Sequence, residues 1–402
     1  MSDALVEECR QRALELLRAN VGPAGMRAAT PGTRAQQRHY DAVFGRDASI
    51  CALGMALSGD PALRQAAALG LATLAARQAA NGQIPKLVDG PGAPGDFWYV
   101  GCIDATLWWL LAVDFLGLRR RFAREVPKAL AWLRCQEHPR WRLLQQNEAS
   151  DWADIMPRTG FVLYTNALWV GVLARYAPRD AARTRTALNT LLYPLDRTPL
   201  ADRRARLLAE EPRRRASLRE LYVSYLNLSH FGDEGDVVGN LLAILYGVPD
   251  AARARRVLGA LRREHAGEPY PVRAVCRPIE EESPQWRPYL ARHRQNFPWQ
   301  YHNGGIWPFA GGLYVAALAQ AGLAAEARRA LVSLARANAL DGWAFNEWLY
   351  GLTGVPRGMR GQSWNAAGFL IAHRAVARTA AGTRKRPRAA GRAAAETRAG
   401  PW

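Results

Sequence analysis

Helix-length apolar stretches recur along almost the whole sequence, and this repetition limits the fold more than any other feature. Apolar residues spaced as on one face of a helix predict twelve helices, over residues 3–20, 47–59, 61–79, 103–117, 121–136, 161–176, 179–192, 237–247, 251–262, 306–322, 323–338 and 362–377. Strand-like alternation is scarce, and the Gly/Pro cluster DGPGAPGD (89–96) falls between helices as a loop. The sequence therefore predicts an all-α protein.

Six clusters of polar and aromatic residues stand directly before strongly apolar helices. They are FGRD (44–47), WYVGCID (98–104), DWAD (151–154), FGDEGD (231–236), YHNGG (301–305) and GQSW (361–364). Successive clusters are roughly 50 to 80 residues apart, which leaves room for a helix, a returning helix and two loops. Two concentric rings of six helices, an (α/α)6 barrel, fit this spacing and would bring all six clusters to one mouth. The alternative for Asp47, Asp104 and Asp236 is that each only caps a helix.

The barrel is expected to occupy residues 1–378 as the catalytic domain. Residues 379–402 are rich in Arg, Ala and Gly without periodicity, and this basic tail is predicted to be disordered. Residues 202–219 are dense in charge and are interpreted as an exposed helical excursion from the barrel.

Charge and cysteine content narrow the partners and the compartment. The net charge of +19 comes almost entirely from Arg, since Lys occurs only at 86, 128 and 385, and much of it falls on helix faces or in the tail. The positive charge is therefore interpreted as a solvated surface rather than as a nucleic-acid-binding site. The sequence has no long uncharged apolar run and no leader of basic and then apolar residues at its start. Neither a membrane span nor export is therefore expected. The scattered cysteines predict neither disulfides nor zinc but buried thiols in a reducing, cytoplasmic location: Cys9, Cys51, Cys102, Cys135 and Cys276. Homo-oligomer formation is left open.

Tryptophan, present 14 times, gathers at the six clusters. Flat aromatic faces beside Asp, Asn, Gln and Arg suit a sugar, which offers apolar C–H faces and a rim of hydroxyls; core packing is the alternative for each Trp. Phosphate-loop, dinucleotide and zinc-protease motifs and the serine-hydrolase elbow are absent from the sequence. GDEGD (232–236) lacks the ligand pattern of a calcium loop, so no metal or cofactor is predicted.

Paired carboxylates are the chemistry that remains. Glycoside hydrolysis needs a protonated acid for the leaving oxygen and an ionised carboxylate that attacks or activates water. Asp154 follows Trp152 and precedes Ile155 and Met156, where desolvation is expected to raise its pKa and keep it protonated. Glu347 lies in WAFNEWLYG among aromatic residues. Either carboxylate could instead be structural.

At these same residues the sequence resembles six-fold α/α-barrel glycosidases of two kinds. YDAVFGRD (40–47), VGCIDATLWW (100–109), YHNGGIWP (301–308) and SWNAAGFLIA (363–372) resemble neutral/alkaline invertases. DWADIMPRTGFVLYTNALW (151–169) resembles the amylo-α-1,6-glucosidase domain of glycogen debranching enzymes. The resemblance spans roughly residues 38–378. It implies an inverting hydrolase with Asp154 as general acid and Glu347 as general base, separated by about 6.5 to 9.5 Å.

The candidate substrate-binding residues combine the family contacts with the aromatic clusters. They are Arg46, Asp47, Trp98, Asp104, Trp108, Asp151, Trp152, His302, Asn303, Trp307, Gln362 and Trp364. Within residues 155–164, MPRTG (156–160) replaces a histidine-containing stretch of the invertases, and Tyr164 stands where debranching glucosidases have an acidic residue. This loop is therefore expected to decide the identity of the leaving sugar.

The leading hypothesis is hydrolysis of an α-glucosidic bond in a small oligosaccharide or an α-1,6 branch stub. Sucrose cleavage, as by neutral/alkaline invertases (β-fructofuranosidase type), is the alternative enzyme activity. A catalytically silent sugar-binding barrel and a basic nucleic-acid-associated protein acting through its tail are the alternatives from other classes.

Overall fold

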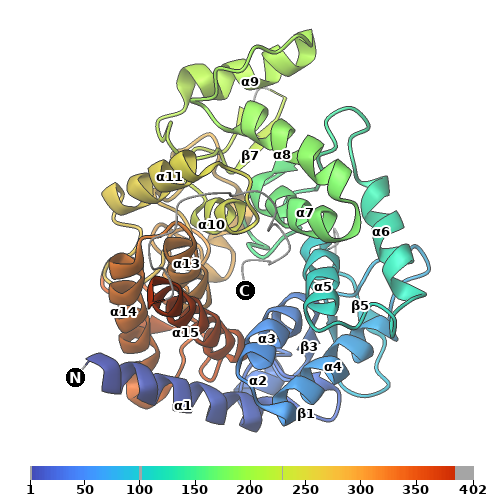
Figure 1. Ribbon diagram of the computed structural model, residues 1–402, viewed down its shortest axis with the longest axis vertical. Helices are drawn as coiled ribbons and strands as arrows, with labels where there is room; N and C mark the ends of the chain where they lie inside the picture. Colours follow the sequence, from blue (N-terminus) through green and yellow to red (C-terminus); the bar gives the residue numbers. More distant parts are fainter. Residues whose placement is uncertain (1, 99–101, 229, 385–402) are drawn as a thin grey trace.

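Six helices form a closed inner ring. The computed structural model describes residues 2–98, 102–228 and 230–384. In the inner ring each helix packs against the next, and the last packs against the first (Figure 1). These helices are α3 (Gly45–Leu57), α5 (Ile103–Phe115), α7 (Leu163–Tyr176), α10 (Val237–Leu245), α13 (Pro308–Gln320) and α15 (Ser363–Arg384).

Six further helices form an outer ring, and each packs against the inner helix with which it is paired. They are α1 (Ser2–Asn20), α4 (Pro61–Ala75), α6 (Glu125–Cys135), α8 (Pro178–Leu192), α11 (Ala251–Arg263) and α14 (Ala324–Trp343). Because α1 packs against α15, the two ends of the chain complete the sixth pair. The (α/α)6 barrel expected from the sequence is confirmed, and each of the twelve predicted helices is present in the described part of the chain.

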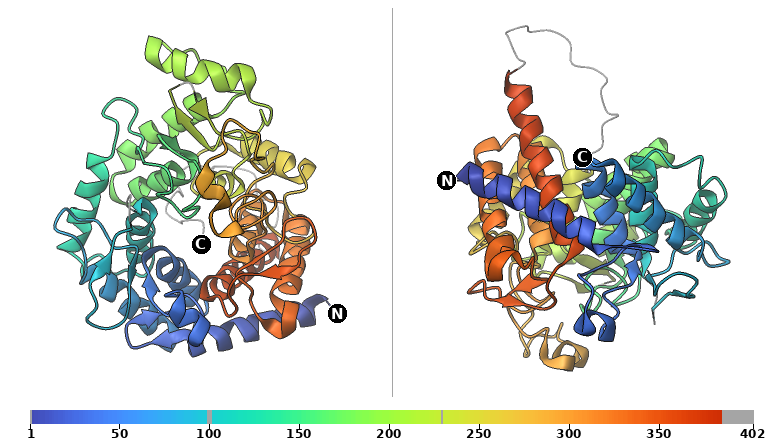
Figure 2. Two further views of the ribbon diagram at one scale, coloured as in Figure 1. Left: turned by 180° about the vertical axis from the view of Figure 1, so that it is seen from behind. Right: turned by 90° about the horizontal axis from the view of Figure 1, so that it is seen from below.

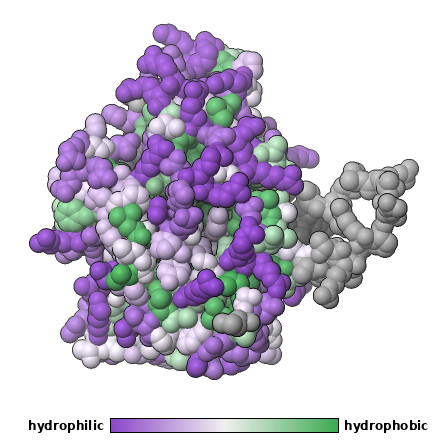
Figure 3. All heavy atoms as spheres, turned by 90° about the vertical axis from the view of Figure 1, so that its left-hand side faces the viewer, coloured by the Kyte–Doolittle hydropathy of each residue, from purple (hydrophilic) through white to green (hydrophobic). Residues whose placement is uncertain are grey.

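The difference between the rings follows from composition. In α5 every residue from Ile103 to Val113 is buried, because neighbours cover this inner helix on all sides. In α8 only one face is buried, and its charged residues face outward. Where α13 crosses α15 the backbones approach closely, since a Cβ on Gly312 would overlap Gly368. The outer surface beside α11 and α14 is mainly hydrophilic (Figure 3).

Short antiparallel strands tie the loops of the barrel. One sheet joins β3 (Val43–Phe44), β4 (Leu87–Val88) and β5 (Gly95–Asp96), and a second joins β6 (Phe161–Val162), β7 (Tyr225–Asn227) and β8 (His230–Phe231). Two pairs complete them: β9 (Trp348–Leu349) with β10 (Pro356–Arg357), and β1 (Val21–Gly22) with β2 (Gly25–Met26). β3 and β6 lead directly into α3 and α7, so the sheets fix where these inner helices begin.

Several shorter helices lie outside the two rings of the barrel. The predicted excursion is α9 (Arg203–Arg215), which projects at the top of Figure 1. The short helices α2 (Thr33–Gln37), α12 (Pro288–Ala291) and η1 (Arg292–Arg294) lie in loops and are too brief for periodicity to reveal. Figure 2 shows the end of α15 projecting from one end of the barrel and the α12 loop from the other.

Two expectations need correction. The last helix continues to Arg384, so residues 379–384 belong to α15 rather than to a disordered tail, and residues 385–402 lie outside the described part of the chain. Cys135 is exposed, whereas the other four cysteines are buried as expected. Among the described residues, no helix combines the length and apolarity needed to cross a bilayer, and no three His, Cys, Asp or Glu side chains gather as metal ligands.

Candidate active site

A cavity of about 580 Å³ opens where the inner helices begin, and both candidate catalytic carboxylates line it. Its wall is built from loops that are distant in sequence: Ala28, Arg38, His39, Tyr40, Phe44, Arg46, Asp47, Lys86, Leu87, Asp89, Ala93, Pro94, Gly95, Asp96, Trp98, Trp152, Asp154, Tyr301, His302, Trp307, Glu347, Gln362 and Trp364. The barrel thus brings five of the six predicted clusters to one place.

The inner part of the cavity is aromatic. The His302 ring stacks on Trp307 with centroids 5.2 Å apart, and Trp152 meets Trp307 edge-on at 5.4 Å. Several polar atoms in this wall are buried without a hydrogen bond to any described residue: both amide atoms of Gln362, Nε1 of Trp152 and of Trp364, Nδ1 of His302 and Oδ2 of Asp47. Apolar faces interspersed with such donors and acceptors suit a ligand rich in hydroxyl groups.

Asp154 is paired with a lysine. The Lys86 ammonium donates to Asp154 Oδ2 at 3.0 Å, and His302 Nδ1 lies 3.9 Å from Oδ1. Burial raises the pKa of Asp154, but the charge and hydrogen bond of Lys86, together with the charge of Arg46, outweigh it and hold the pKa below its ordinary value. The expectation that desolvation beside Trp152 keeps Asp154 protonated is therefore wrong in this structure. Burial also lowers the pKa of His302 to about 3, so this imidazole is neutral near pH 7.

Glu347 is held by neutral donors. Its side chain is 4% exposed, Tyr40 Oη donates to Oε1 at 2.5 Å, and the Met359 N–H donates to Oε2 at 2.8 Å. Burial raises the pKa of Glu347 above its ordinary value, because these two hydrogen bonds only partly compensate for desolvation. The sequence analysis missed Tyr40 as a site residue, although it opens the YDAVFGRD motif.

Asp104 and Trp108 lie behind the cavity wall rather than on it. Asp104 is fully buried, accepts from Tyr164 Oη at 2.9 Å, and lies 3.4 Å from Arg46 Nη1. Trp108 Nε1 donates to the same Tyr164 hydroxyl at 2.8 Å. Both predicted contacts thus support Arg46, which does line the cavity, instead of facing a ligand themselves.

Asp151 and Asn303 also act from behind the wall. Asp151 accepts the Ala153 N–H at 2.8 Å, which fixes the turn that carries Trp152 and Asp154, and burial raises its pKa to about 6. Asn303 is fully buried and exchanges hydrogen bonds of 2.7 and 2.8 Å with the backbone of Ile279. Neither residue lines the cavity, so the geometry does not favour direct contact between a ligand and either side chain.

The alternative that each of the three aspartates caps a helix applies to only one of them. Asp47 and Asp104 lie inside the first turns of α3 and α5, whose N-caps are Phe44 and Cys102. Asp236 does occupy the N-cap position of α10. It also lies 3.2 Å from Arg158, in a buried ion pair.

The loop at 155–164 does not reach the cavity. None of its residues is in the wall, and Met156, Arg158 and Tyr164 are almost fully buried. The Arg158 guanidinium is directed instead to Asp236. The expectation that this loop decides the identity of the leaving sugar stays a prediction, and direct contact does not support it in this cavity, whose wall includes residues 38–44 and 86–98 instead.

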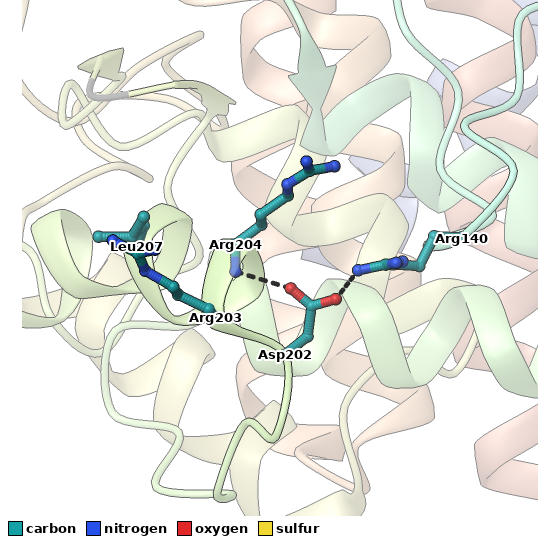
Figure 4. Close-up of a pocket in the computed structure, with 5 residues that line it drawn as sticks. All are labelled: Arg140, Asp202, Arg203, Arg204 and Leu207. Atoms are coloured by element: carbon teal, nitrogen blue, oxygen red, sulfur yellow. Dashed lines mark hydrogen bonds and ion pairs between the residues drawn. The ribbon is translucent and has the colours of Figure 1, made fainter.

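A second hollow of about 440 Å³ lies outside the barrel, between α9 and the loop after α6 (Figure 4). It is lined by Arg140, Asp202, Arg203, Arg204 and Leu207. Asp202 caps α9 by accepting the Arg204 N–H at 2.7 Å and also pairs with Arg140. These interactions join α9 to the barrel, and the hollow offers no pair of carboxylates among its lining residues.

One segment of the chain is similar to alkaline and neutral invertases. The family model of alkaline and neutral invertases matches residues 233–379. Probable alkaline/neutral invertase D of Arabidopsis thaliana is 35% identical over 142 residues, which cover 34% of this chain and 26% of that protein. Cytosolic invertase 1 of Oryza sativa subsp. japonica is 32% identical over 141 residues, covering 34% and 24%. The chain therefore matches about a quarter of the length of these relatives.

Solved structures resemble the whole barrel. The family 63 mannosylglycerate hydrolase of Thermus thermophilus, in complex with Tris and D-glycerate, superposes with a TM-score of 0.63 at 17% identity, over 90% of this chain and 99% of that one. A glycosidase in complex with glucose gives a TM-score of 0.60 at 17% identity, over 94% and 98%. The protein therefore has the six-hairpin glycosidase fold.

Within that class, residues 233–379 are similar to alkaline and neutral invertases, which confirms that resemblance for this segment. The segment supplies Tyr301, His302, Trp307, Glu347, Gln362 and Trp364 to the cavity. The resemblance of residues 151–169 to debranching glucosidases stays a prediction.

Proposed function

We propose that the protein is an inverting glycoside hydrolase that cleaves an α-glucosidic bond in a small oligosaccharide or an α-1,6 branch stub. One observation carries the proposal: Asp154 and Glu347 line a single cavity whose inner wall combines aromatic faces with unpaired polar atoms. Paired carboxylates flanking a sugar site are the machinery of glycoside hydrolysis. The invertase similarity of residues 233–379 supports the same reaction class.

The two carboxylates have different roles in the proposed reaction. Asp154, in its protonated form, donates to the leaving oxygen as the glycosidic bond breaks. Glu347 takes a proton from water, which attacks the anomeric carbon from the opposite face, so the product has inverted configuration. Tyr40 and the Met359 N–H each bind one oxygen of Glu347, which fixes the carboxylate plane. The remaining lone pairs are available to the attacking water.

The wall divides into a sugar side and a leaving-group side. Trp152, His302 and Gln362 form the inner side and hold the glucosyl unit. The leaving group faces residues 86–98 and His39, whose Nδ1 lies 3.0 Å from Asp89 Oδ2 and links the two rim segments. This link across the rim favours a short leaving group over a polymer chain.

Sucrose is the second candidate substrate, and it also contains an α-glucosidic bond. The observation that favours it is the invertase match, because that segment contributes Glu347 and much of the inner wall. The predicted cytoplasmic location stays a prediction, in line with the name of the rice relative. The oligomeric state and the absence of a nucleic-acid partner also stay predictions.

The test is turnover of sucrose, isomaltose, panose and maltotriose, followed by proton NMR of the first product. We expect glucose to appear as the β-anomer before mutarotation. Initial release of the α-anomer would overturn the inverting mechanism. Binding of these sugars without turnover of any of them would instead support a catalytically silent barrel.

A further inference from the structure

Lys86 stands out from the other basic residues of the protein. Lysine occurs only at three positions, and apart from the histidines the other basic side chains are arginines. Lys86 is 6% exposed in its side chain and is the one lysine in the described cavity wall. A lysine ammonium is a compact cation on a flexible stem, with three rotatable donors. The site therefore holds a small and redirectable charge.

The backbone of Lys86 is fixed on both sides. Its N–H donates to the Asp96 carbonyl at 2.7 Å, and its carbonyl accepts the Gly45 N–H at 2.7 Å. The first bond belongs to the β4–β5 hairpin and the second links Lys86 to the start of α3. Any change in the contacts of the ammonium therefore has to come from its side chain.

The ammonium lies between the acid and the leaving-group wall. Its Nζ is 3.0 Å from Asp154 Oδ2 and 3.1 Å from the centroid of the Trp98 ring. Asp154 is 23% exposed in its side chain and Lys86 also faces the cavity, so a leaving-group oxygen that approaches the acid meets both. An ammonium has three donors, of which the bond to Asp154 uses one.

This arrangement conflicts with proton donation unless it changes on binding. An acid that accepts a charge-assisted hydrogen bond from an ammonium is stabilised as a carboxylate. A carboxylate has no proton to donate to a leaving oxygen. The pair must therefore rearrange before Asp154 can act as the general acid.

We propose that Lys86 couples leaving-group binding to the protonation of Asp154: it holds the acid ionised in the free enzyme and transfers its hydrogen bond to a leaving-group hydroxyl oxygen when substrate binds. Asp154 then takes up one proton from solvent and delivers it to the glycosidic oxygen. The attacking water gives one proton to Glu347, which returns it to solvent, so protons balance over one turnover. This inference rests on the proposed hydrolase function.

Other groups act on Asp154 but do not explain the switch. Arg46 on α3 keeps its charge at every accessible pH. His302 is neutral near pH 7, since its pKa is about 3. Tyr40 and Tyr301 feel the charge of Asp154, and burial holds their pKa values well above the ordinary value, so both stay protonated. Lys86 is the cation that makes a direct hydrogen bond to the acid.

The test measures proton uptake on binding, in a Glu347→Gln background that prevents turnover and removes the second carboxylate. Calorimetric titration with the sugar that the parent enzyme hydrolyses, in two buffers of different ionisation enthalpy at pH 7, gives the protons taken up per bound ligand. We expect net uptake in Glu347→Gln and none in the Asp154→Asn/Glu347→Gln control. Proton uptake should persist when Lys86→Arg is added to Glu347→Gln. It should shrink when Lys86→Met is added, because burial then leaves Asp154 more protonated before the sugar binds.

Binding without uptake in Glu347→Gln would overturn the inference, as would equal uptake in the Lys86→Arg and Lys86→Met proteins. If Lys86→Met does not fold, the comparison of Glu347→Gln with its Asp154→Asn double variant still decides the matter, because it leaves Lys86 in place. Failure of the proposed function looks different: no sugar of the panel would be hydrolysed by the parent enzyme.

Discussion

The two sides of the cavity hold their carboxylates by different means. On one side a buried ammonium binds Asp154 and lowers its pKa, and on the other a phenol and a backbone N–H bind Glu347, whose pKa is raised by burial. Sequence reasoning assigned the proton donor to Asp154 and the base to Glu347. The shifts in this structure run opposite to those roles. Under the coupling proposed for Lys86, substrate binding reverses the protonation state of Asp154.

The largest effects are expected at the two carboxylates. Asp154→Asn and Glu347→Gln should each reduce kcat by about 10²- to 10⁴-fold, because each removes one half of the acid/base pair. Glu347→Gln should leave the thermal unfolding midpoint nearly unchanged, because its partners Tyr40 and the Met359 N–H are neutral. Asp154→Asn should lower the midpoint, because it leaves the buried Lys86 ammonium without its carboxylate partner. Full activity in either purified variant would contradict the assignment.

Tyr40→Phe should have an intermediate effect, and it tests the Glu347 side alone. Loss of a hydrogen bond to a charged group is expected to reduce kcat/KM by roughly tenfold to a hundredfold. The Tyr40 bond favours ionised Glu347, so its removal raises the pKa further. Because the base must be ionised, the ratio of variant to parent kcat/KM should be smaller at pH 5 than at pH 8. A ratio that does not change with pH would show that Tyr40 does not act through the ionisation of Glu347.

Trp98→Ala should alter substrate preference more than it alters chemistry. Trp98 lines the leaving-group side, so we expect a higher KM and a changed ratio of kcat/KM between sucrose and isomaltose. Thr159→Ala is the matched control, because residues 155–164 do not line the cavity. A larger change of preference in Thr159→Ala than in Trp98→Ala would return the leaving-group site to that loop.

The smallest effect is expected at the rim. His39 and Asp89 make an exposed polar contact, and exposed pairs of this kind contribute about 0 to 1 kcal/mol even when both partners are charged. His39→Ala should therefore change kcat/KM for a disaccharide by less than about fivefold. A larger gain on maltotriose than on isomaltose would indicate that the pair limits the length of the leaving group.

The barrel was predictable because helix periodicity is a local signal. Twelve apolar stretches became twelve helices, and their spacing placed the junctions at one mouth. Asp154 and most of the inner wall followed from the motifs at those junctions, and Glu347 followed from the separate motif WAFNEWLYG. Asp104 and Asn303 were misplaced because sequence does not distinguish a side chain in the cavity wall from one that supports it.

Lys86 and Tyr40 were missed for a related reason. Their roles arise from contacts with residues 68 and 307 positions away, which no local pattern encodes. The same limitation affected the pKa of Asp154. Its apolar sequence neighbours suggested a raised value, whereas an ammonium from β4–β5 lowers it.

The most direct test of the assignment uses α-D-glucosyl fluoride, whose leaving group needs little help from a general acid. We predict that Asp154→Asn, although impaired on the natural leaving sugar, retains most of the parent activity on the fluoride, because Glu347 still activates water. Glu347→Gln should lose activity on both substrates. Retention of fluoride hydrolysis by Glu347→Gln and its loss in Asp154→Asn would reverse the two roles and contradict the account.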